Sequence, residues 1–400
     1  MDLVSPHPFW LLKNGLLNEY PSLAGDARCD VVVLGAGISG ALISHSLVRA
    51  GLDVIVIDKR DVGCGSTSAS TALLQYEIDE HLIDLTRRMG KRDAERAYRA
   101  CHASIDTIER LAFEVGARCT FRRKPSAYFA TKPSEIATLR REGEARRAAG
   151  IVVDFLEEKE ISTLFSFSRP AALISTQAAQ LDAHRLTHTL LHDSAGRGGR
   201  IFDRTHVDEF VPGKRAVRLK TDTGHVIRAG HVVFATGYES QDFLPRRVVQ
   251  LKSTFALATE RVTHFPGWWK QCLIWETARP YLYLRTAADG RILVGGEDAP
   301  FRDPVRRDRL VDSKTARLEA RFRELFPEIE FAVDYRWAGT FGETKDGLAY
   351  IGQIRQMPRC YFALGFGGNG ITYSAIAADI IREALAGRRH ADAHLFKFDR

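Results

Sequence analysis

The sequence predicts an α/β protein in which a Rossmann-like dinucleotide-binding domain is interleaved with an α+β domain built on an antiparallel sheet. Near the N-terminus a buried strand, a glycine turn, a helix, a second strand and an acid follow one another. Two more apolar runs end in glycine turns downstream, and stretches with helical and strand periodicity separate them. We assign residues 1–78, 150–250 and 336–400 to the first domain, and 79–149, mostly helical, and 251–335 to the second.

Composition excludes several other classes of protein. The 400 residues are 45% hydrophobic and 27% charged, which is the balance of a chain with a buried core. There are 57 Lys and Arg against 50 Asp and Glu, but basic and acidic residues are mixed along the chain, which argues against nucleic-acid binding. The six cysteines show no metal-binding spacing, and no apolar stretch approaches membrane-spanning length. We therefore expect a cytoplasmic protein without metal, and its oligomeric state stays open.

The first motif begins at the buried strand Asp30–Leu34. Gly35-Ala36-Gly37-Ile38-Ser39-Gly40 follows it, and helical periodicity then continues to Gly51. The next strand, Val54–Ile57, ends at Asp58, which lies 23 residues after Gly35. In a dinucleotide site the glycines allow the turn and the approach of the pyrophosphate, and the acid binds the adenosine ribose. The whole context therefore predicts dinucleotide binding.

Three later segments carry small or hydroxyl-bearing residues. Gly63–Thr71 contains Ser66, Thr67, Ser68 and Ala69; it suits a pyrophosphate or a flavin edge, or it is an ordinary polar loop. A strand at 231–234 leads into Ala235-Thr236-Gly237, and a strand at 361–364 leads into Gly365–Gly370 and a helix over 371–385.

The predicted second domain combines helices and alternating strands. Helical spacing runs from Ala94 to Val115 and again from Ser134 to Ala149. Strands are predicted at 253–259, 273–276, 281–285 and 291–295. In the third of these the alternation places Tyr281, Tyr283 and Arg285 on one face, which either meets solvent or lines a cavity.

These motifs resemble the D-amino-acid oxidase-like flavoprotein superfamily, and in particular its glycine oxidase and sarcosine oxidase branch. The resemblance rests on GAGISG, GSTSAST, the ATG at 235–237, Lys345-Asp346-Gly347 and GFGGNG, and it extends over nearly the whole chain. It implies FAD in an extended conformation, with the last glycine loop placing a helix N-terminus near the flavin pyrimidine ring. The expected FAD contacts are Gly35, Ala36, Gly37, Ile38, Ser39, Gly40, Asp58, Lys59, Arg60, Ser66, Thr67, Ser68, Ala69, Val207, Ala235, Thr236, Gly237, Gly339, Gly367, Gly368, Asn369, Gly370, Ile371 and Thr372.

The chain departs from the superfamily where the substrate carboxylate is held. The resemblance places Phe341 at the position of the glycine oxidase arginine, and Gln75 and Thr372 at the positions of the basic residues of sarcosine oxidase. None of the three is charged, so a simple α-amino acid is disfavoured unless Arg285 or Lys345 substitutes. Gly339 stands near the position of the cysteine that links flavin in sarcosine oxidase, so we expect noncovalent FAD.

The resulting hypothesis is oxidation of the C–N bond of an amine or amino-acid-like molecule, with a hydride passing to flavin N5, hydrolysis of the imine, and oxygen as acceptor. A flavin dehydrogenase of a 2-hydroxy acid that uses a quinone or another carrier is the alternative, and a non-catalytic FAD-binding subunit is a second one. The candidate pocket residues are Gln75, Tyr76, Glu77, Tyr283, Arg285, Phe341, Glu343 and Thr372. We expect His184, His188 and His192 to form a solvated helix edge that binds no metal.

Overall fold

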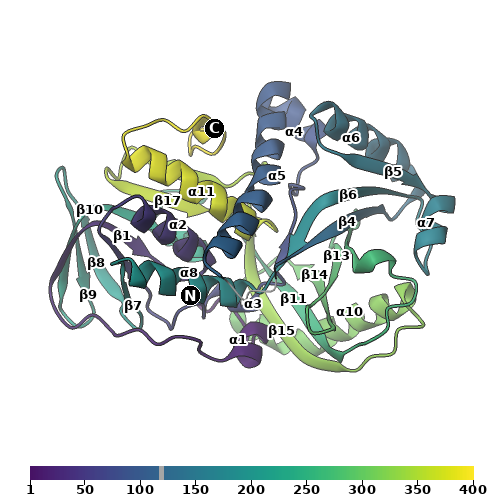
Figure 1. The fold of residues 1–400 in the computed structure, drawn as a ribbon, viewed down its shortest axis with the longest axis horizontal. Coiled ribbons are helices and arrows are strands. Elements are labelled where there is room, and N and C mark those ends of the chain that lie inside the picture. The colour runs from purple at the N-terminus through teal and green to yellow at the C-terminus, as the bar shows by residue number, and fades with distance from the viewer. Residues whose placement is uncertain (117–120) are drawn as a thin grey trace.

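The computed structural model describes residues 1–116 and 121–400. These residues form two sheets, one of eight strands and one of nine. Figure 1 shows the two halves side by side, with the long helix α5 (Lys91–Glu114) running between them. The chain passes from one half to the other several times, which confirms the predicted fold class of a Rossmann-like domain interleaved with an α+β domain.

The first sheet has the predicted parallel centre. Its strands are β1 (Ala27–Leu34), β2 (Val54–Ile57), β7 (Arg200–Phe202), β8 (Val207–Pro212), β9 (Val217–Thr221), β10 (Val226–Phe234), β16 (Tyr350–Gln353) and β17 (Cys360–Leu364). The order β17-β10-β1-β2-β7 is parallel throughout, β16 pairs antiparallel with β17, and the β8–β9 hairpin extends from β10. Apolar β-branched runs form these central strands because both faces are covered.

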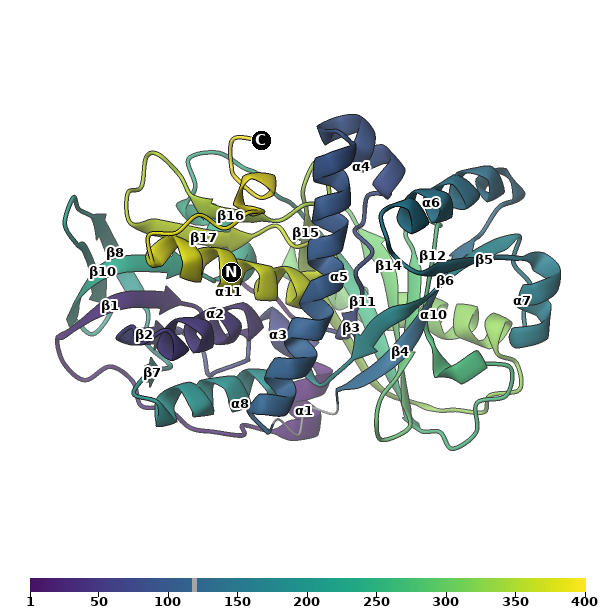
Figure 2. The ribbon, with the colours of Figure 1, turned by 45° about the horizontal axis from the view of Figure 1, so that its top comes forward.

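Three helices pack together in this half: α2 (Ile38–Arg49), α8 (Ala183–Gly196) and α11 (Gly370–Leu385). Figure 2 shows α11, α2 and α8 following one another across the face of the sheet. Helix α2 begins directly after β1, and α11 begins after β17, so both N-termini lie at the carboxyl edge of the parallel strands. Open α/β sheets bind their ligands at this edge.

The second sheet is antiparallel except for the pair β4 and β12. Its strands are β3 (Leu73–Leu74), β4 (Arg122–Ala130), β5 (Val153–Glu157), β6 (Ala171–Gln180), β11 (Gln250–Arg261), β12 (Leu273–Glu276), β13 (Leu282–Thr286), β14 (Arg291–Ala299) and β15 (Val333–Glu343). Helix α10 (Val311–Leu325) packs on β11, β14 and β15, and Trp268 belongs to the apolar cluster formed there. The strands predicted between 253 and 295 all lie in this sheet.

The limits between the two halves differ from the predicted ones. Strands β5 and β6 pair in the second sheet, although residues 150–250 were assigned to the dinucleotide half. Strand β6 is buried on both faces over most of its length, so its sequence looks like a strand of a parallel sheet. Residues 79–149, predicted to be mostly helical, contain β4. The first half of this strand is basic, and Pro125 stands at a shift in its register, so its sequence lacks the usual strand pattern.

The remaining helices lie around the two sheets. They are α1 (Phe9–Asn14), α3 (Ser66–Ala69), α4 (Leu82–Met89), α6 (Ile136–Ala148), α7 (Glu158–Leu164) and α9 (Pro304–Arg309). Within residues 1–116 and 121–400, no helix combines the length and the apolar character that a membrane span requires. The same residues contain no cluster of three or more His, Cys, Asp or Glu side chains placed to hold a metal ion.

Candidate active site

A cavity of about 450 Å³ lies where the two halves meet. The first half contributes the carboxyl ends of its parallel strands, including Leu34 of β1, Ile57 of β2 and Ala235 after β10. The second half contributes Tyr283 of β13 and the segment 339–341 of β15. The cavity therefore occupies the position where an open α/β sheet binds its ligand, with the second sheet as the opposite wall.

The glycine turn after β1 can be built only with glycine at two positions. Gly35 has φ +104°, and a Cβ atom there would lie 2.5 Å from the carbonyl oxygen of Ala235. A Cβ atom on Gly40 would overlap the carbonyl of Gly35. Both residues let α2 start tightly against β1, which brings the helix N-terminus to the cavity wall.

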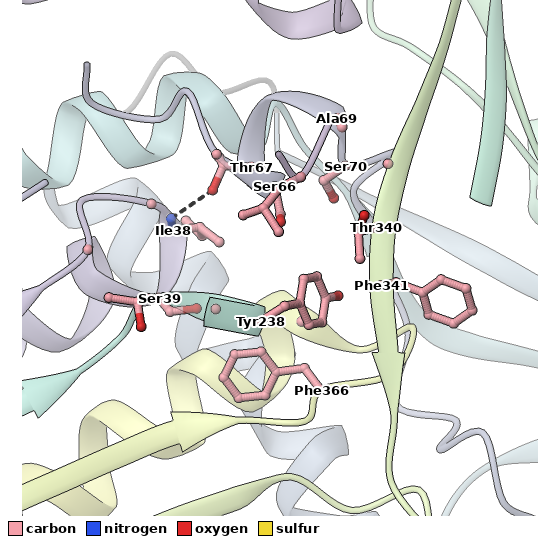
Figure 3. Close-up of a pocket in the computed structure, with 18 of the residues that line it drawn as sticks. Ile38, Ser39, Ser66, Thr67, Ala69, Ser70, Tyr238, Thr340, Phe341 and Phe366 are labelled. Carbon is pink, nitrogen blue, oxygen red and sulfur yellow. Dashed lines mark hydrogen bonds between the residues drawn. The ribbon is translucent and has the colours of Figure 1, made fainter. Parts of the chain in front are cut away.

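The N-terminus of α2 is open toward the cavity. Gly37 occupies the N-cap position without a side-chain cap. The N–H of Ile38 donates to Thr67 Oγ1 at 2.9 Å, as Figure 3 shows. Ser66 Oγ is buried without a hydrogen-bond partner among the described residues, and its side chain is drawn beside Thr67 in Figure 3. A helix N-terminus next to the unpaired hydroxyl of Ser66 suits an anionic group such as a pyrophosphate.

Asp58, at the end of β2, holds the glycine turn in place. Its carboxylate accepts hydrogen bonds from the N–H groups of Ala36, at 2.7 Å, and Arg60, at 2.9 Å. Burial raises the pKa of this carboxyl, and the two N–H groups oppose that shift. A carboxylate has about four lone-pair sites, so Asp58 keeps acceptor capacity for a ribose hydroxyl.

Next to Asp58, three cationic groups surround one carboxylate. Oε1 of Glu239 lies 2.9 Å from Lys59 Nζ, 3.1 Å from Arg60 Nη2 and 2.6 Å from the amine of Met1. Burial opposes its charge, but hydrogen bonds from Arg60, the Met1 amine and Lys59 outweigh burial and lower the pKa of Glu239 to about 2. Lys59 and Arg60 therefore both pair with Glu239, but this one carboxylate faces three cationic groups, so positive charge remains at this end of the cavity.

The loop before α11 forms the opposite end of the cavity. Gly367–Ile371 line it, and Asn369 at the N-cap has no side-chain cap on the helix. Instead Asn369 Nδ2 donates to the carbonyl of Glu77 at 2.7 Å, which ties the loop to the chain segment that follows β3. The positive end of α11 points at the cavity, as a site that stabilises negative charge on a reduced flavin requires. The glycine turn, the open α2 terminus and this loop fit the FAD that the sequence implies.

The segment after β3 turns alternate residues toward the cavity. Gln75, Glu77 and Asp79 line it, whereas Tyr76 and Ile78 are buried in the apolar core. Backbone extension explains the alternation, since successive side chains of an extended chain point to opposite faces. The predicted tyrosine face of β13 behaves in the same way: Tyr281 and Tyr283 line the cavity, and Leu282 is in the core.

Glu77 is a buried carboxylate with one free oxygen. Its side chain is 3% exposed. Oε1 accepts a hydrogen bond from Ser126 Oγ at 2.8 Å and lies 3.7 Å from Arg146 Nη1, whereas Oε2 has no partner among the described residues. Burial raises the pKa of Glu77, and Arg146 partly offsets that shift.

Strand β15 presents two neighbouring side chains to different parts of the site. In Figure 3, Thr340 points toward Ser66, Ser70 and Tyr238, whereas Phe341 leaves the strand on the other side. Both residues line the cavity, and Thr340 Oγ1 has no hydrogen-bond partner among the described residues. Phe341 therefore puts an apolar ring in the cavity wall at the position where the resemblance places an arginine.

Most of the predicted FAD contacts line this cavity. Those that do are Gly35, Gly37, Ile38, Ser39, Asp58, Lys59, Arg60, Ser66, Thr67, Ala69, Val207, Ala235, Thr236, Gly237, Gly339, Gly367, Gly368, Asn369, Gly370 and Ile371. Ala36, Gly40, Ser68 and Thr372 lie behind the wall. Ser68 Oγ donates to the carbonyl of Gly65 at 2.8 Å, and Thr372 Oγ1 donates to that of Asn369 at 2.9 Å, so both hydroxyls support the loops that form the wall.

The predicted pocket residues divide in the same way. Gln75, Glu77, Tyr283 and Phe341 line the cavity, and Tyr76, Arg285, Glu343 and Thr372 do not. Arg285 is 1% exposed, and its guanidinium lies 5.4 Å from the centre of the Trp10 ring. Glu343 forms an ion pair of 2.5 Å with Lys252. Neither Arg285 nor Glu343 is therefore placed to meet a substrate in this cavity.

Sequence reasoning missed several lining residues. They include Asp79, Tyr238, Glu239, Thr254 and Thr340. The alternation from Gln75 through Glu77 would have pointed to Asp79. The others come from turns and from long-range strand pairing, which leave no local pattern.

The prediction of a solvated histidine edge on α8 is wrong for two of its three members. His184 and His188 are buried, and only His192 is exposed. Helix α8 packs on α2, and Gly63 leaves room for the His184 ring, from which a Cβ atom would be only 3.0 Å away. Burial lowers the pKa of both buried histidines to about 4.

Known proteins resemble this chain over almost its whole length. A glycine oxidase of Geobacillus kaustophilus is 25% identical over 91% of this chain and 94% of its own. The gamma-glutamylputrescine oxidoreductase of Escherichia coli is 24% identical over 92% of this chain and 86% of its own. The crystal structure of L-proline dehydrogenase from P. horikoshii superposes with a TM-score of 0.78 over 93% of this chain and 97% of that one, at 20% identity.

A family model described as "DAO: FAD dependent oxidoreductase" matches residues 30–384. This range includes both glycine-rich helix starts, the segment after β3 and the tyrosine face of β13. It confirms the resemblance that the glycine-rich motifs indicate. The chain belongs to the DAO family of FAD-dependent oxidoreductases.

Proposed function

We propose that the protein oxidises a carbon–nitrogen bond of an amine or amino-acid-like small molecule, with noncovalently bound FAD as the electron acceptor in the protein. The observation that carries this proposal is a single cavity that joins the N-termini of α2 and α11 to an end lined by aromatic and carboxylate side chains. The names of the two sequence relatives, a glycine oxidase and a gamma-glutamylputrescine oxidoreductase, support the same substrate class.

The chain offers FAD a binding site without a covalent link. The glycine turn and the α2 terminus would hold the pyrophosphate, Asp58 the ribose, and the α11 terminus the flavin pyrimidine ring. None of the described residues that line the cavity is a cysteine, and Gly339 occupies the wall where the resemblance places a linking cysteine.

Bound FAD supplies an acceptor for a hydride and thereby for two electrons. The protein contributes orientation: Trp275, Tyr281 and Tyr283 form a wall that would hold the carbon next to nitrogen against the flavin. Burial raises the pKa of Tyr283 to about 12, so its phenol keeps its proton at neutral pH and acts as a hydrogen-bond donor. The substrate loses a hydride and a proton and becomes an imine, which water hydrolyses outside the flavin step.

A 2-hydroxy acid is a weaker candidate substrate for a physical reason. Its carboxylate needs a cationic partner, and the Lys and Arg side chains among the described lining residues are Lys59 and Arg60, which pair with Glu239 and follow Asp58 at the end expected to hold the ribose. The substrate end of the cavity instead carries Glu77 and Asp79. We propose oxygen as the final electron acceptor, with a quinone or another carrier as the alternative.

Anaerobic spectroscopy tests this function. The FAD-loaded protein is mixed with single compounds: amines, N-methyl amino acids, D- and L-amino acids, and 2-hydroxy acids. We expect the flavin band near ~450 nm to bleach with an amine or amino-acid-like compound and to return when air is admitted. Bleaching by hydroxy acids alone would contradict the proposal, and a band that returns only with an added quinone would identify a dehydrogenase.

A further inference from the structure

We propose that the substrate carries a second basic nitrogen, away from the carbon–nitrogen bond that is oxidised, and that Glu77 and Asp79 bind this nitrogen as a cation. This inference rests on the proposed amine oxidation and specifies its substrate class. It predicts that diamines and their N-alkyl derivatives are preferred over monoamines and over simple α-amino acids.

The first observation is the free oxygen of Glu77. This side chain is 97% buried, lines the cavity, and leaves Oε2 without a hydrogen-bond partner among the described residues. A buried polar atom with no partner is costly unless a ligand completes it. Because a carboxylate oxygen only accepts hydrogen bonds, the missing group is a donor, and an ammonium group supplies the strongest one.

The nearby arginine does not remove the negative charge of this region. Arg146 lies 3.7 Å from Glu77 but makes its closer contact, 2.8 Å, with Glu142. Glu142 also accepts hydrogen bonds from the N–H groups of Leu82 and Ile83, which favours its charged form. One arginine therefore serves two carboxylates, and a net charge of about −1 remains when both are ionised.

Asp79 adds a second carboxylate that forms no ion pair within residues 1–116 and 121–400. Its Oδ2 accepts a hydrogen bond from the N–H of Gly368 at 3.0 Å. Asp79 lies between the cavity and a neighbouring hollow of about 340 Å³, whose three other carboxylates have partners: Glu80 pairs with Arg88, Asp84 pairs with Arg87, and Glu135 accepts hydrogen bonds from Thr131 and Thr277. Burial raises the pKa of Asp79, and the charges of Arg279 and Lys252 partly offset that shift without forming an ion pair with it, so Asp79 is available to a cation where the two spaces meet.

The walls near these carboxylates suit an alkyl chain. Trp275 lines the cavity and stacks on Tyr128 of the neighbouring hollow, with ring centres 3.7 Å apart. The cavity wall at this end contains no Lys or Arg among the described residues, and the exposed Arg279 belongs to the outer hollow. Aromatic faces favour both methylene groups and cations.

The bound cation cannot be the nitrogen that reacts. Hydride loss from the neighbouring carbon requires the lone pair of an uncharged amine, whereas a carboxylate favours the charged form of the nitrogen it binds. Two roles therefore call for two nitrogens, one neutral beside the flavin and one cationic at Glu77 and Asp79.

The test compares N-methylbutylamine with N-methyl-1,4-diaminobutane, which share a four-carbon chain and differ in the second nitrogen. Anaerobic stopped-flow reduction of the FAD-loaded protein over a range of concentrations separates the dissociation constant from the limiting rate. We expect the diamine to bind at least tenfold more tightly. Asp79→Asn and Glu77→Gln should each reduce the ratio of the two dissociation constants several-fold.

Asp84→Asn is the matched control, because it removes a carboxylate of the outer hollow that already pairs with Arg87. This variant should keep the full preference for the diamine. Equal dissociation constants of the two amines in the unmodified protein would overturn the inference without any variant, as would a preference that survives in both Asp79→Asn and Glu77→Gln. If no amine or amino acid reduces the flavin, the proposed function itself fails.

Discussion

The two ends of the cavity are built in different ways. The end expected to hold the phosphates comes from one continuous stretch, in which β1, the glycine turn, α2, β2 and Asp58 follow within about thirty residues. The substrate end is assembled from segments after β3, on β13 and on β15, which are far apart in the sequence. The first end depends on backbone geometry, and the second depends on which side chains the fold brings together.

The largest expected effect comes from a methyl group in the glycine turn. Gly35→Ala places a Cβ atom 2.5 Å from the carbonyl oxygen of Ala235 at a φ of +104°. Such backbone strain costs on the order of 1–3 kcal/mol, and the overlap adds to it. We expect almost complete loss of bound FAD and a lower melting temperature, measured from the 450 to 280 nm absorbance ratio and by thermal unfolding.

Gly25→Ala provides the matched control, because a Cβ atom on Gly25 meets no atom within 4 Å. This variant should keep its FAD. If Gly35→Ala binds FAD as well as Gly25→Ala does, FAD binding at the phosphate end does not require the tight glycine turn.

The next largest effect is expected at Asp58. Asp58→Ala leaves the N–H groups of Ala36 and Arg60 without their acceptors. Each unsatisfied buried donor costs about 1–3 kcal/mol, so stability should fall by about 2 kcal/mol in urea unfolding and FAD should dissociate more readily. Asp58→Asn retains one acceptor oxygen, so its stability should lie between those of the unmodified protein and Asp58→Ala. An unchanged midpoint for Asp58→Ala would show that the turn does not need this carboxylate.

The substrate end should respond to side-chain chemistry instead. Phe341→Arg introduces a cation into the cavity wall at the place where the resemblance puts the carboxylate anchor of glycine oxidase. We expect the affinity for N-methylglycine to rise roughly tenfold, about 1.4 kcal/mol, as measured by the concentration dependence of flavin reduction. Phe341→Leu keeps the wall apolar and should show no such gain; a gain of equal size in both variants would contradict the assignment.

The smallest expected effect is a pH dependence of stability near the same end. Burial raises the pKa of Asp298 to about 6, although a hydrogen bond with Thr254 opposes the shift. The folded protein then binds a proton between pH 4 and pH 6 that the unfolded chain does not, so this group makes stability fall as pH rises through that window. Asp298→Asn removes this contribution.

Urea unfolding at pH 5 and pH 7.5 measures the effect. The unfolding free energy of Asp298→Asn minus that of the unmodified protein should be about 1 kcal/mol larger at pH 7.5 than at pH 5. A difference between the two proteins that is the same at both pH values would show that Asp298 has an ordinary pKa.

The contrast between the two ends also explains what the sequence could reveal. Around Gly35 the spacing from strand to acid is local, so the turn, the helix and Asp58 were all predicted correctly in position. At the substrate end, alternation predicted which face of β13 holds the polar residues, but it left open whether that face meets solvent or the cavity. It could not predict that Arg285 stays outside the cavity, since its guanidinium lies near the ring of Trp10, a residue of α1 that is far away in the sequence.

Burial was the other quantity that local patterns did not determine. His184 and His188 look like a polar helix face, yet they pack behind the loop at Gly63. Strand β6 looks like part of a parallel sheet, yet it pairs antiparallel with β4. Both outcomes follow from contacts with segments more than forty residues away, so they required the structure.

The visible spectrum of the purified protein, recorded before and after denaturation, tests most directly whether this cavity holds one FAD per chain without a covalent bond. We predict a flavin spectrum with a stoichiometry of about one and release of all the colour into solution when the protein is unfolded and filtered. A colourless protein that cannot be reconstituted with FAD, or colour that stays with the unfolded chain, would contradict noncovalent FAD binding in this cavity.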